Sequence, residues 1–165
     1  MAKASKASGS TPAVRALQAA DIAFGEHPYH HDPSAASYGL EAAEALGVPA
    51  AQVFKTLVAD TGSELVVGVV PVAGQLDLKA LAAALGVKKL AMAKVADAER
   101  SSGYVAGGIS PIGQRKALRT VIDQSALDFD RVYVSGGRRG FDISLAPADL
   151  VQVTKAVTAP IATDS

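Results

Sequence analysis

The order of apolar and polar positions predicts helices interleaved with strands. Helices are expected from Pro12, with Thr11 as the N-cap, and over 38–46, 78–85, 94–100 and 147–156. Extended segments are expected at 24–30, 53–59, 65–70, 88–92, 119–123, 131–135 and 141–145. Asp60-Thr61-Gly62-Ser63 joins two of these strands as a hairpin, so the sheet cannot be all parallel. The pattern therefore predicts an α+β fold with a mixed sheet.

One strand breaks its own apolar pattern with a lysine. Alternate side chains of a strand share a face, so Val53, Lys55, Leu57 and Ala59 are expected on one side of the strand. Two explanations are open for Lys55. It lies at a sheet edge and extends its ammonium to water, or it lines a pocket and presents the ammonium to a carbonyl or phosphate oxygen.

Composition places the chain among ordinary single-domain globular proteins. It has 165 residues, of which 49% are hydrophobic, and no cysteine. The missing cysteine excludes disulfides, thiolate metal sites and a cysteine nucleophile. The N-terminus lacks a signal-peptide pattern, and the apolar run 65–70 is too short to span a membrane. These features predict a cytoplasmic protein with no membrane partner, and residues 1–10 are expected to form a flexible basic tail.

The charges balance overall but not locally. Sixteen Lys and Arg residues match sixteen Asp and Glu residues, which argues against nucleic-acid binding through charge alone. Arg115, Lys116 and Arg119 nevertheless cluster in one segment, and Arg138 and Arg139 in another. Both clusters border glycine-rich loops. They are either solvated surface charge or contacts to phosphate.

Two glycine-rich loops could bring backbone close to a ligand. The loop 107–114 has adjacent glycines followed by Ser-Pro, but lacks the pattern of a P-loop or a dinucleotide fingerprint. The second loop, 134–143, contains Ser135 at the end of a strand. It does not form the Gly-x-Ser-x-Gly nucleophile elbow, so Ser135 is expected to contact a ligand and not to act as a nucleophile.

All three histidines fall within His27–His31, next to Asp32. These residue types suit a zinc or iron site, which makes a metal one hypothesis. The two prolines nearby disrupt regular ligand spacing, and in an extended segment His30 and His31 face opposite ways. Histidines that flank a pocket are the favoured alternative.

Five segments match the motifs of one known family, both in their residues and in their order along the chain. They are Tyr29-His30-His31-Asp32-Pro33, Val53-Phe54-Lys55-Thr56-Leu57, Pro71-Val72-Ala73-Gly74-Gln75-Leu76-Asp77-Leu78, Gly107-Gly108-Ile109-Ser110-Pro111 with Gly113-Gln114, and Ser135-Gly136-Gly137-x-Arg139-Gly140-x-Asp142-Ile143. Together they resemble the YbaK family of bacterial Cys-tRNA(Pro) deacylases, which is related to the editing domain inserted in bacterial prolyl-tRNA synthetases. The resemblance runs from about Thr11 to Lys155.

The resemblance implies a fold and a set of partners. It implies one domain over 11–156 with a curved, barrel-like mixed sheet flanked by helices, followed by a tail at 157–165. The family needs no cofactor and no metal. Its substrate is misacylated tRNA, Cys-tRNA(Pro), and it is thought to work beside prolyl-tRNA synthetase. The sequence is compatible with a monomer or a homodimer.

The resemblance also implies a site. Lys55 matches the family's essential lysine and is the expected catalytic residue. The matched positions expected to bind substrate are Tyr29, Thr56, Gly107, Gly108, Ser135, Gly136 and Asp142. His30 stands where the family often has an acidic residue, which predicts a changed pocket rim or pH response.

In the family's proposed mechanism, the substrate's own thiol attacks its carbonyl and expels the tRNA as a cyclic thiolactone forms. The enzyme then needs only to hold thiol and carbonyl close together. Two alternatives stay open at this point. The protein could be a deacylase for another misacylated tRNA, such as Ala- or Ser-tRNA, or a non-catalytic module that binds tRNA or a synthetase.

Overall fold

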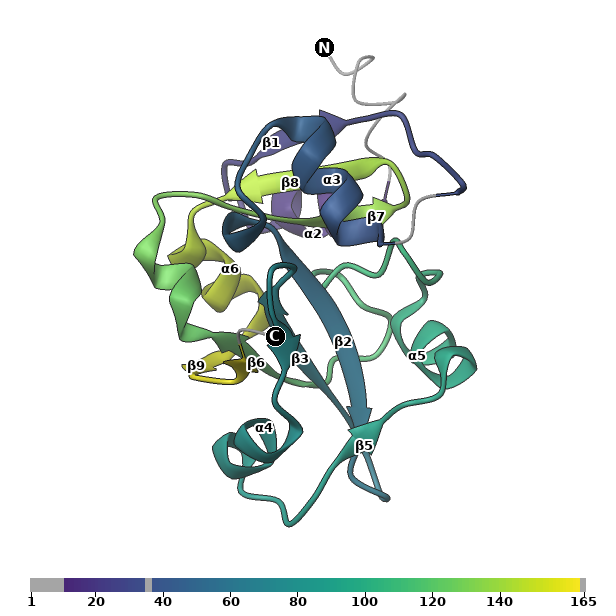
Figure 1. The fold of residues 1–165 in the computed structure, drawn as a ribbon, viewed down its shortest axis with the longest axis vertical. Coiled ribbons are helices and arrows are strands. Elements are labelled where there is room, and N and C mark those ends of the chain that lie inside the picture. Colours follow the sequence, from purple (N-terminus) through teal and green to yellow (C-terminus); the bar gives the residue numbers. More distant parts are fainter. Residues whose placement is uncertain (1–10, 35–36, 164–165) are drawn as a thin grey trace.

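The computed structural model describes residues 11–34 and 37–163, shown in Figure 1. The expected basic tail 1–10 lies outside these residues. The helices are α2 (Pro12–Ala19), α3 (Tyr38–Leu46), α4 (Leu78–Leu85), α5 (Val95–Ser102) and α6 (Pro147–Thr154), with 3-10 turns η1 (Ala50–Gln52) and η2 (Gln124–Asp128). The strands are β1 (Gly25–Pro28), β2 (Phe54–Asp60), β3 (Leu65–Pro71), β4 (Gln75–Leu76), β5 (Ala91–Met92), β6 (Arg119–Asp123), β7 (Val132–Arg138), β8 (Phe141–Leu145), β9 (Val157–Ala159) and β10 (Ala162–Thr163).

The strands divide into two main sheets and one small ribbon. The larger sheet has the order β5-β2-β3-β6-β9, the second has the order β1-β8-β7, and β10 pairs with β4. The β2–β3 pair is antiparallel and the β3–β6 pair is parallel, which confirms a mixed α+β fold. A single parallel bridge between Val53 and Tyr133 joins the main sheets where β2 begins. In Figure 1, β2 runs from the β1-β8-β7 sheet down to β5.

Two apolar clusters sandwich the larger sheet. The main core lies between the two main sheets and takes Val67 and Val69 from one face of β3, together with residues of α2 and α6. Val66 and Val70 point to the other face, where Leu81 of α4 covers them. This alternation is the period of two that a strand buried on both faces requires.

Helix ends follow the sequence signals. The Thr11 and Ser37 hydroxyls accept hydrogen bonds from the first turns of α2 and α3, and Gly47 and Gly86 end α3 and α4 in left-handed conformations. Gly39 lets α3 lie against the strands, because a Cβ there would sit 2.2 Å from Cγ1 of Val72. The start of α3 thereby packs against Val72, which follows β3 and donates a backbone hydrogen bond to the Val53 carbonyl oxygen at 2.8 Å.

The C-terminal segment differs from the expectation. Residues 157–163, expected as part of a tail, form β9 and β10, which pair with β6 and β4. The reason is a long-range contact. The buried Asp123 carboxylate accepts hydrogen bonds from the N–H groups of Ile161 and Ala162 at 2.9 and 3.0 Å, and Ile161 is fully buried. The strand expected at 88–92 is also shorter, because only Ala91 and Met92 pair with β2.

Across the described residues, no helix combines the length and the apolar character that a bilayer-spanning segment needs.

Candidate active site

A pocket opens along one edge of β2. β3 pairs with the whole of β2, but β5 pairs only with its last two residues, Ala59 and Asp60. Within the described residues, the first half of β2 therefore has a free edge, and side chains from both of its faces reach the same cavity. The cavity has a volume of about 430 Å³. It is lined by Tyr29, Ser37, Tyr38, Gly39, Ala42, Val53, Phe54, Lys55, Thr56, Leu57, Val58, Val72, Met92, Ala93, Val95, Ala98, Ala106, Gly107, Ile109, Ser135 and Asp142.

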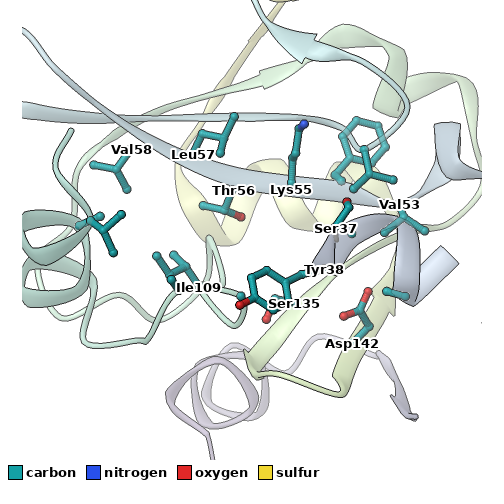
Figure 2. Close-up of a pocket in the computed structure, with 18 of the residues that line it drawn as sticks. Ser37, Tyr38, Val53, Lys55, Thr56, Leu57, Val58, Ile109, Ser135 and Asp142 are labelled. Atoms are coloured by element: carbon teal, nitrogen blue, oxygen red, sulfur yellow. The ribbon is translucent and has the colours of Figure 1, made fainter. Parts of the chain in front are cut away.

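Lys55 and Thr56 enter the pocket from opposite faces of β2. Figure 2 shows Lys55 and Leu57 on one side of the strand and Thr56 on the other, as strand alternation predicts. Lys55 is half-buried and forms no hydrogen bond or ion pair with the described residues. The Thr56 hydroxyl is buried and likewise has no partner there. Two polar groups thus stand in the pocket with their bonding capacity unused.

Ser135 and Asp142 face each other across the β7–β8 ladder. Asp142 is 5% exposed, and burial raises the pKa of its carboxyl to about 7. Among the described lining residues it is the sole acidic side chain, and Lys55 is the sole basic one. Ser135 lies in the middle of β7, directly before the point where the pairing with β8 becomes irregular, and its hydroxyl accepts a hydrogen bond from the Gly137 N–H at 3.1 Å.

Tyr29 follows β1 and lines the pocket near Asp142. Burial raises the pKa of its phenol to about 12, and the nearby Asp142 and Glu41 carboxyls add to that effect. The phenol therefore stays protonated at neutral pH and can donate a hydrogen bond into the pocket.

A comparison with known protein families identifies the family of this chain. The model of the aminoacyl-tRNA editing domain matches residues 32–153, which is most of the chain. The matched range includes Lys55, Thr56, Ser135 and Asp142. The chain belongs to this family. The expected family resemblance is thus confirmed.

A curated relative of this editing domain covers nearly its whole length. It is EbsC of Enterococcus faecalis, named as a candidate Cys-tRNA(Pro)/Cys-tRNA(Cys) deacylase, and is 37% identical over 161 residues, 96% of each chain. Two solved structures share the fold. One is described as a candidate trans-editing enzyme for prolyl-tRNA synthetase (24% identity, TM-score 0.76, covering 93% of this chain and 98% of that one). The other is the uncharacterised protein APE2540 (24% identity, TM-score 0.82, covering 92% and 99%).

Five of the seven expected substrate-binding residues line the pocket of the editing domain, and two do not. Tyr29, Thr56, Gly107, Ser135 and Asp142 line it, as does Lys55. Gly108 packs against the β7–β8 turn instead, since a Cβ there would lie 2.6 Å from Cα of Arg138. Gly136 faces the Phe141 ring, where a Cβ would lie 2.4 Å from a ring carbon. Neither glycine lines the cavity, and both allow a close approach that a Cβ would block.

The three histidines have different surroundings and different partners. The His27 ring nitrogen Nε2 lies 2.8 Å from the Ser144 hydroxyl, and His31 Nδ1 lies 2.9 Å from the Glu41 carboxylate. His30 is exposed and does not line the pocket, so the structure does not support the expected change of the pocket rim there. No group of three or more metal-ligating side chains forms among residues 11–34 and 37–163.

Two pocket residues, the N-cap of α3 and its first residue, were not predicted from the sequence. Ser37 and Tyr38 line the pocket, and Tyr38 is 40% exposed. In Figure 2 the Tyr38 ring lies near Ser135 and Ile109. An exposed aromatic directly after a helix N-cap was the available signal.

The two basic clusters have different surroundings. Arg115 and Lys116 line a surface groove together with Asp60, Glu64 and Asp97, so its charges are mixed. This favours solvated surface charge for the first cluster. Arg139 of the second cluster contacts two residues that line the pocket, Ala106 and Tyr38.

Proposed function

We propose that this editing domain is a trans-editing deacylase that releases cysteine from mischarged tRNA(Pro) by substrate-thiol-assisted cleavage of the aminoacyl ester. The observation that carries the proposal is a largely apolar pocket holding one ammonium, Lys55, and one carboxyl, Asp142, neither paired with the described residues. An aminoacyl ester has a carbonyl oxygen that can accept a hydrogen bond from the ammonium and an α-ammonium that can pair with the carboxylate. The editing-domain family and the name of the Enterococcus relative point to the same substrate class.

Lys55 is assigned to the ester carbonyl. As a nucleophile attacks, negative charge develops on the carbonyl oxygen, and a fixed ammonium in a partly buried site stabilises that charge. Because Lys55 has no counter-ion among the described residues, its charge is available to the substrate.

Asp142 is assigned to the substrate's α-ammonium. An unpartnered buried carboxyl is unfavourable when ionised, and the raised pKa of Asp142 reflects this. A bound ammonium would compensate the carboxylate and fix the orientation of the aminoacyl group. The buried Thr56 hydroxyl can accept or donate one further hydrogen bond to the substrate.

The substrate thiol supplies the nucleophile. The chain has no cysteine, and no histidine lines the described pocket, so Ser37, Thr56 and Ser135 have no histidine base beside them there. In the proposed step, the cysteine sulfur bonds to its own carbonyl carbon and the bond to the ribose oxygen breaks. The thiol proton ends on the released ribose hydroxyl, and the product is a four-membered thiolactone. The pocket contributes proximity, which in favourable cases is worth about 7–11 kcal/mol.

Recognition of the tRNA body is assigned to a partner. With equal numbers of basic and acidic residues, the chain has little net attraction for RNA at long range. We therefore place the protein beside prolyl-tRNA synthetase in the cytoplasm. The synthetase would deliver the mischarged tRNA, because a pocket that accepts proline cannot strongly reject a residue of similar size.

The test is a panel of esters on one tRNA. Purified protein is incubated with Cys-, Ser- and Ala-tRNA(Pro), and release of each amino acid is measured over time. We expect the cysteine ester to be cleaved and the other two to remain at the uncatalysed rate. Cleavage of the serine ester as fast as the cysteine ester would refute thiol assistance. An N-acetylated cysteine ester tests Asp142 separately and is expected to react slowly.

A further inference from the structure

Arg139 lies at the rim of the pocket and is fixed there by two contacts. Its Nε donates a hydrogen bond to the Ala106 carbonyl oxygen at 2.8 Å. Its guanidinium carbon lies 5.0 Å from the centroid of the Tyr38 ring, a cation–π arrangement. Ala106 and Tyr38 both line the cavity, so the guanidinium is held beside its opening.

The fixed guanidinium keeps donors available. A guanidinium has five N–H donors in a planar fork, and here only Nε has a hydrogen-bond partner in the described part of the chain. The side chain is exposed and forms no ion pair with those residues. The terminal amino groups can therefore bind an anion without first giving up a partner.

The neighbouring loop is shaped to admit this arginine. Gly107 has φ +87°, and a Cβ at that position would lie 2.8 Å from Nε of Arg139 and 3.0 Å from the Tyr38 ring. A side chain there would push the guanidinium off its ring and its carbonyl. Gly107 thus keeps Arg139, Tyr38 and the loop in contact.

We propose that Arg139 binds the phosphodiester on the 5′ side of the terminal nucleoside of the aminoacyl-RNA. This inference rests on the proposed function. If the acyl group occupies the pocket beside Lys55, the nucleic acid leaves through its opening, and the first anion along the chain is this phosphodiester. A planar guanidinium matches phosphate oxygens in a bidentate geometry. In a chain without net charge, one pre-organised cation at this position fixes the register of the RNA end.

The test compares two small esters that differ by one phosphodiester. One is the cysteinyl ester of adenosine, and the other is the cysteinyl ester of the dinucleotide CpA. The readout is the ratio of their kcat/KM values. For Arg139→Gln we expect the preference for the dinucleotide to fall by about tenfold to a hundredfold, mostly through KM, as for the loss of hydrogen bonds to a charged group. Arg139→Lys should keep an intermediate preference.

Arg138→Gln is the matched control. It removes the same charge from the same turn, but the Arg138 guanidinium lies over the Phe141 ring, 4.5 Å from its centroid, and not over a residue that lines the pocket. Its ratio should equal that of the wild type.

A loss in Arg139→Gln that is equal for both esters would overturn the inference, since Arg139 would then only support the loop. An unchanged ratio and rate would overturn it as well. A wild type inert on both esters would overturn the proposed function, and this inference with it.

Discussion

Replacing Asp142 with asparagine should stabilise the fold increasingly as the pH rises. Burial raises the pKa of this carboxyl from 3.8 to about 7 in the folded protein. Below pH 3.8 the carboxyl is protonated in both states. Between that pH and about 7 it is ionised only in the unfolded chain, so each pH unit lowers the free energy of unfolding by roughly 1.4 kcal/mol. Above pH 7 both states are ionised and the loss stops growing.

The expected magnitude follows from the size of the shift. About three pH units correspond to about 4 kcal/mol lost by pH 8, relative to acidic pH. Asparagine cannot ionise, so Asp142→Asn removes this term and leaves the shape of the side chain nearly unchanged. The difference in stability between the variant and the wild type should therefore grow from pH 4.5 to about 7 and then level off.

The assay is urea denaturation at half-unit intervals of pH between 4.5 and 8. Asp130→Asn, an exposed position, controls for the loss of one carboxylate. A stability difference for Asp142→Asn that does not vary with pH would refute the reasoning. It would mean that the folded protein holds the Asp142 carboxylate ionised, compensated by water or by Lys55.

Three further substitutions probe the supports of the pocket. Thr56→Val removes a buried, unpartnered hydroxyl, so urea denaturation should show equal stability or a gain of about 1 kcal/mol, while cleavage of the cysteine ester slows. A stability loss in this variant would contradict the unpartnered state. Gly108→Ala places a Cβ 2.6 Å from the Arg138 backbone and should lower the free energy of unfolding by about 1–3 kcal/mol in the same assay. Ser144→Ala removes a hydroxyl that lies 2.8 Å from both His27 Nε2 and Arg131 Nη1, and should destabilise by about 1–3 kcal/mol; a change below the error of the assay would count against both contacts.

Sequence alone predicted the helices and the alternation of side chains along β2 well, because both depend on local signals. Capping residues such as Thr11 and glycines such as Gly47 act within a few positions of the helix they bound. The alternation of β2 correctly separated Lys55 from Thr56, since the period of two is a property of any strand.

Contacts between segments that are distant along the chain could not be predicted from the sequence. The free edge of β2 exists because β5 pairs with only two of its residues, and no local pattern encodes that length. Tyr38 and Arg139 meet only after α3 and the β7–β8 turn have packed. The C-terminal strands depend on the buried Asp123, which accepts hydrogen bonds from Ile161 and Ala162.

The family motifs contain residues that line the candidate pocket and residues that do not. Ser135 and Gly136 are neighbours in one motif, yet successive strand residues face opposite ways, so only Ser135 lines the pocket. Gly107 and Gly108 divide in the same manner between the cavity and the β7–β8 turn. These two motifs therefore mix residues that line the cavity with residues that shape the backbone around it.

The most direct test of the account is the rate at which the protein releases cysteine from Cys-tRNA(Pro), measured for the wild type and for Lys55→Ala. If the ammonium stabilises the carbonyl oxygen, the substitution should lower the rate on the order of 10²–10³-fold, as for the loss of one oxyanion-stabilising group. Urea denaturation should show that the variant remains folded. A folded Lys55→Ala protein that cleaves the ester within about threefold of the wild-type rate, far less than such a loss predicts, would contradict the central role assigned to this lysine.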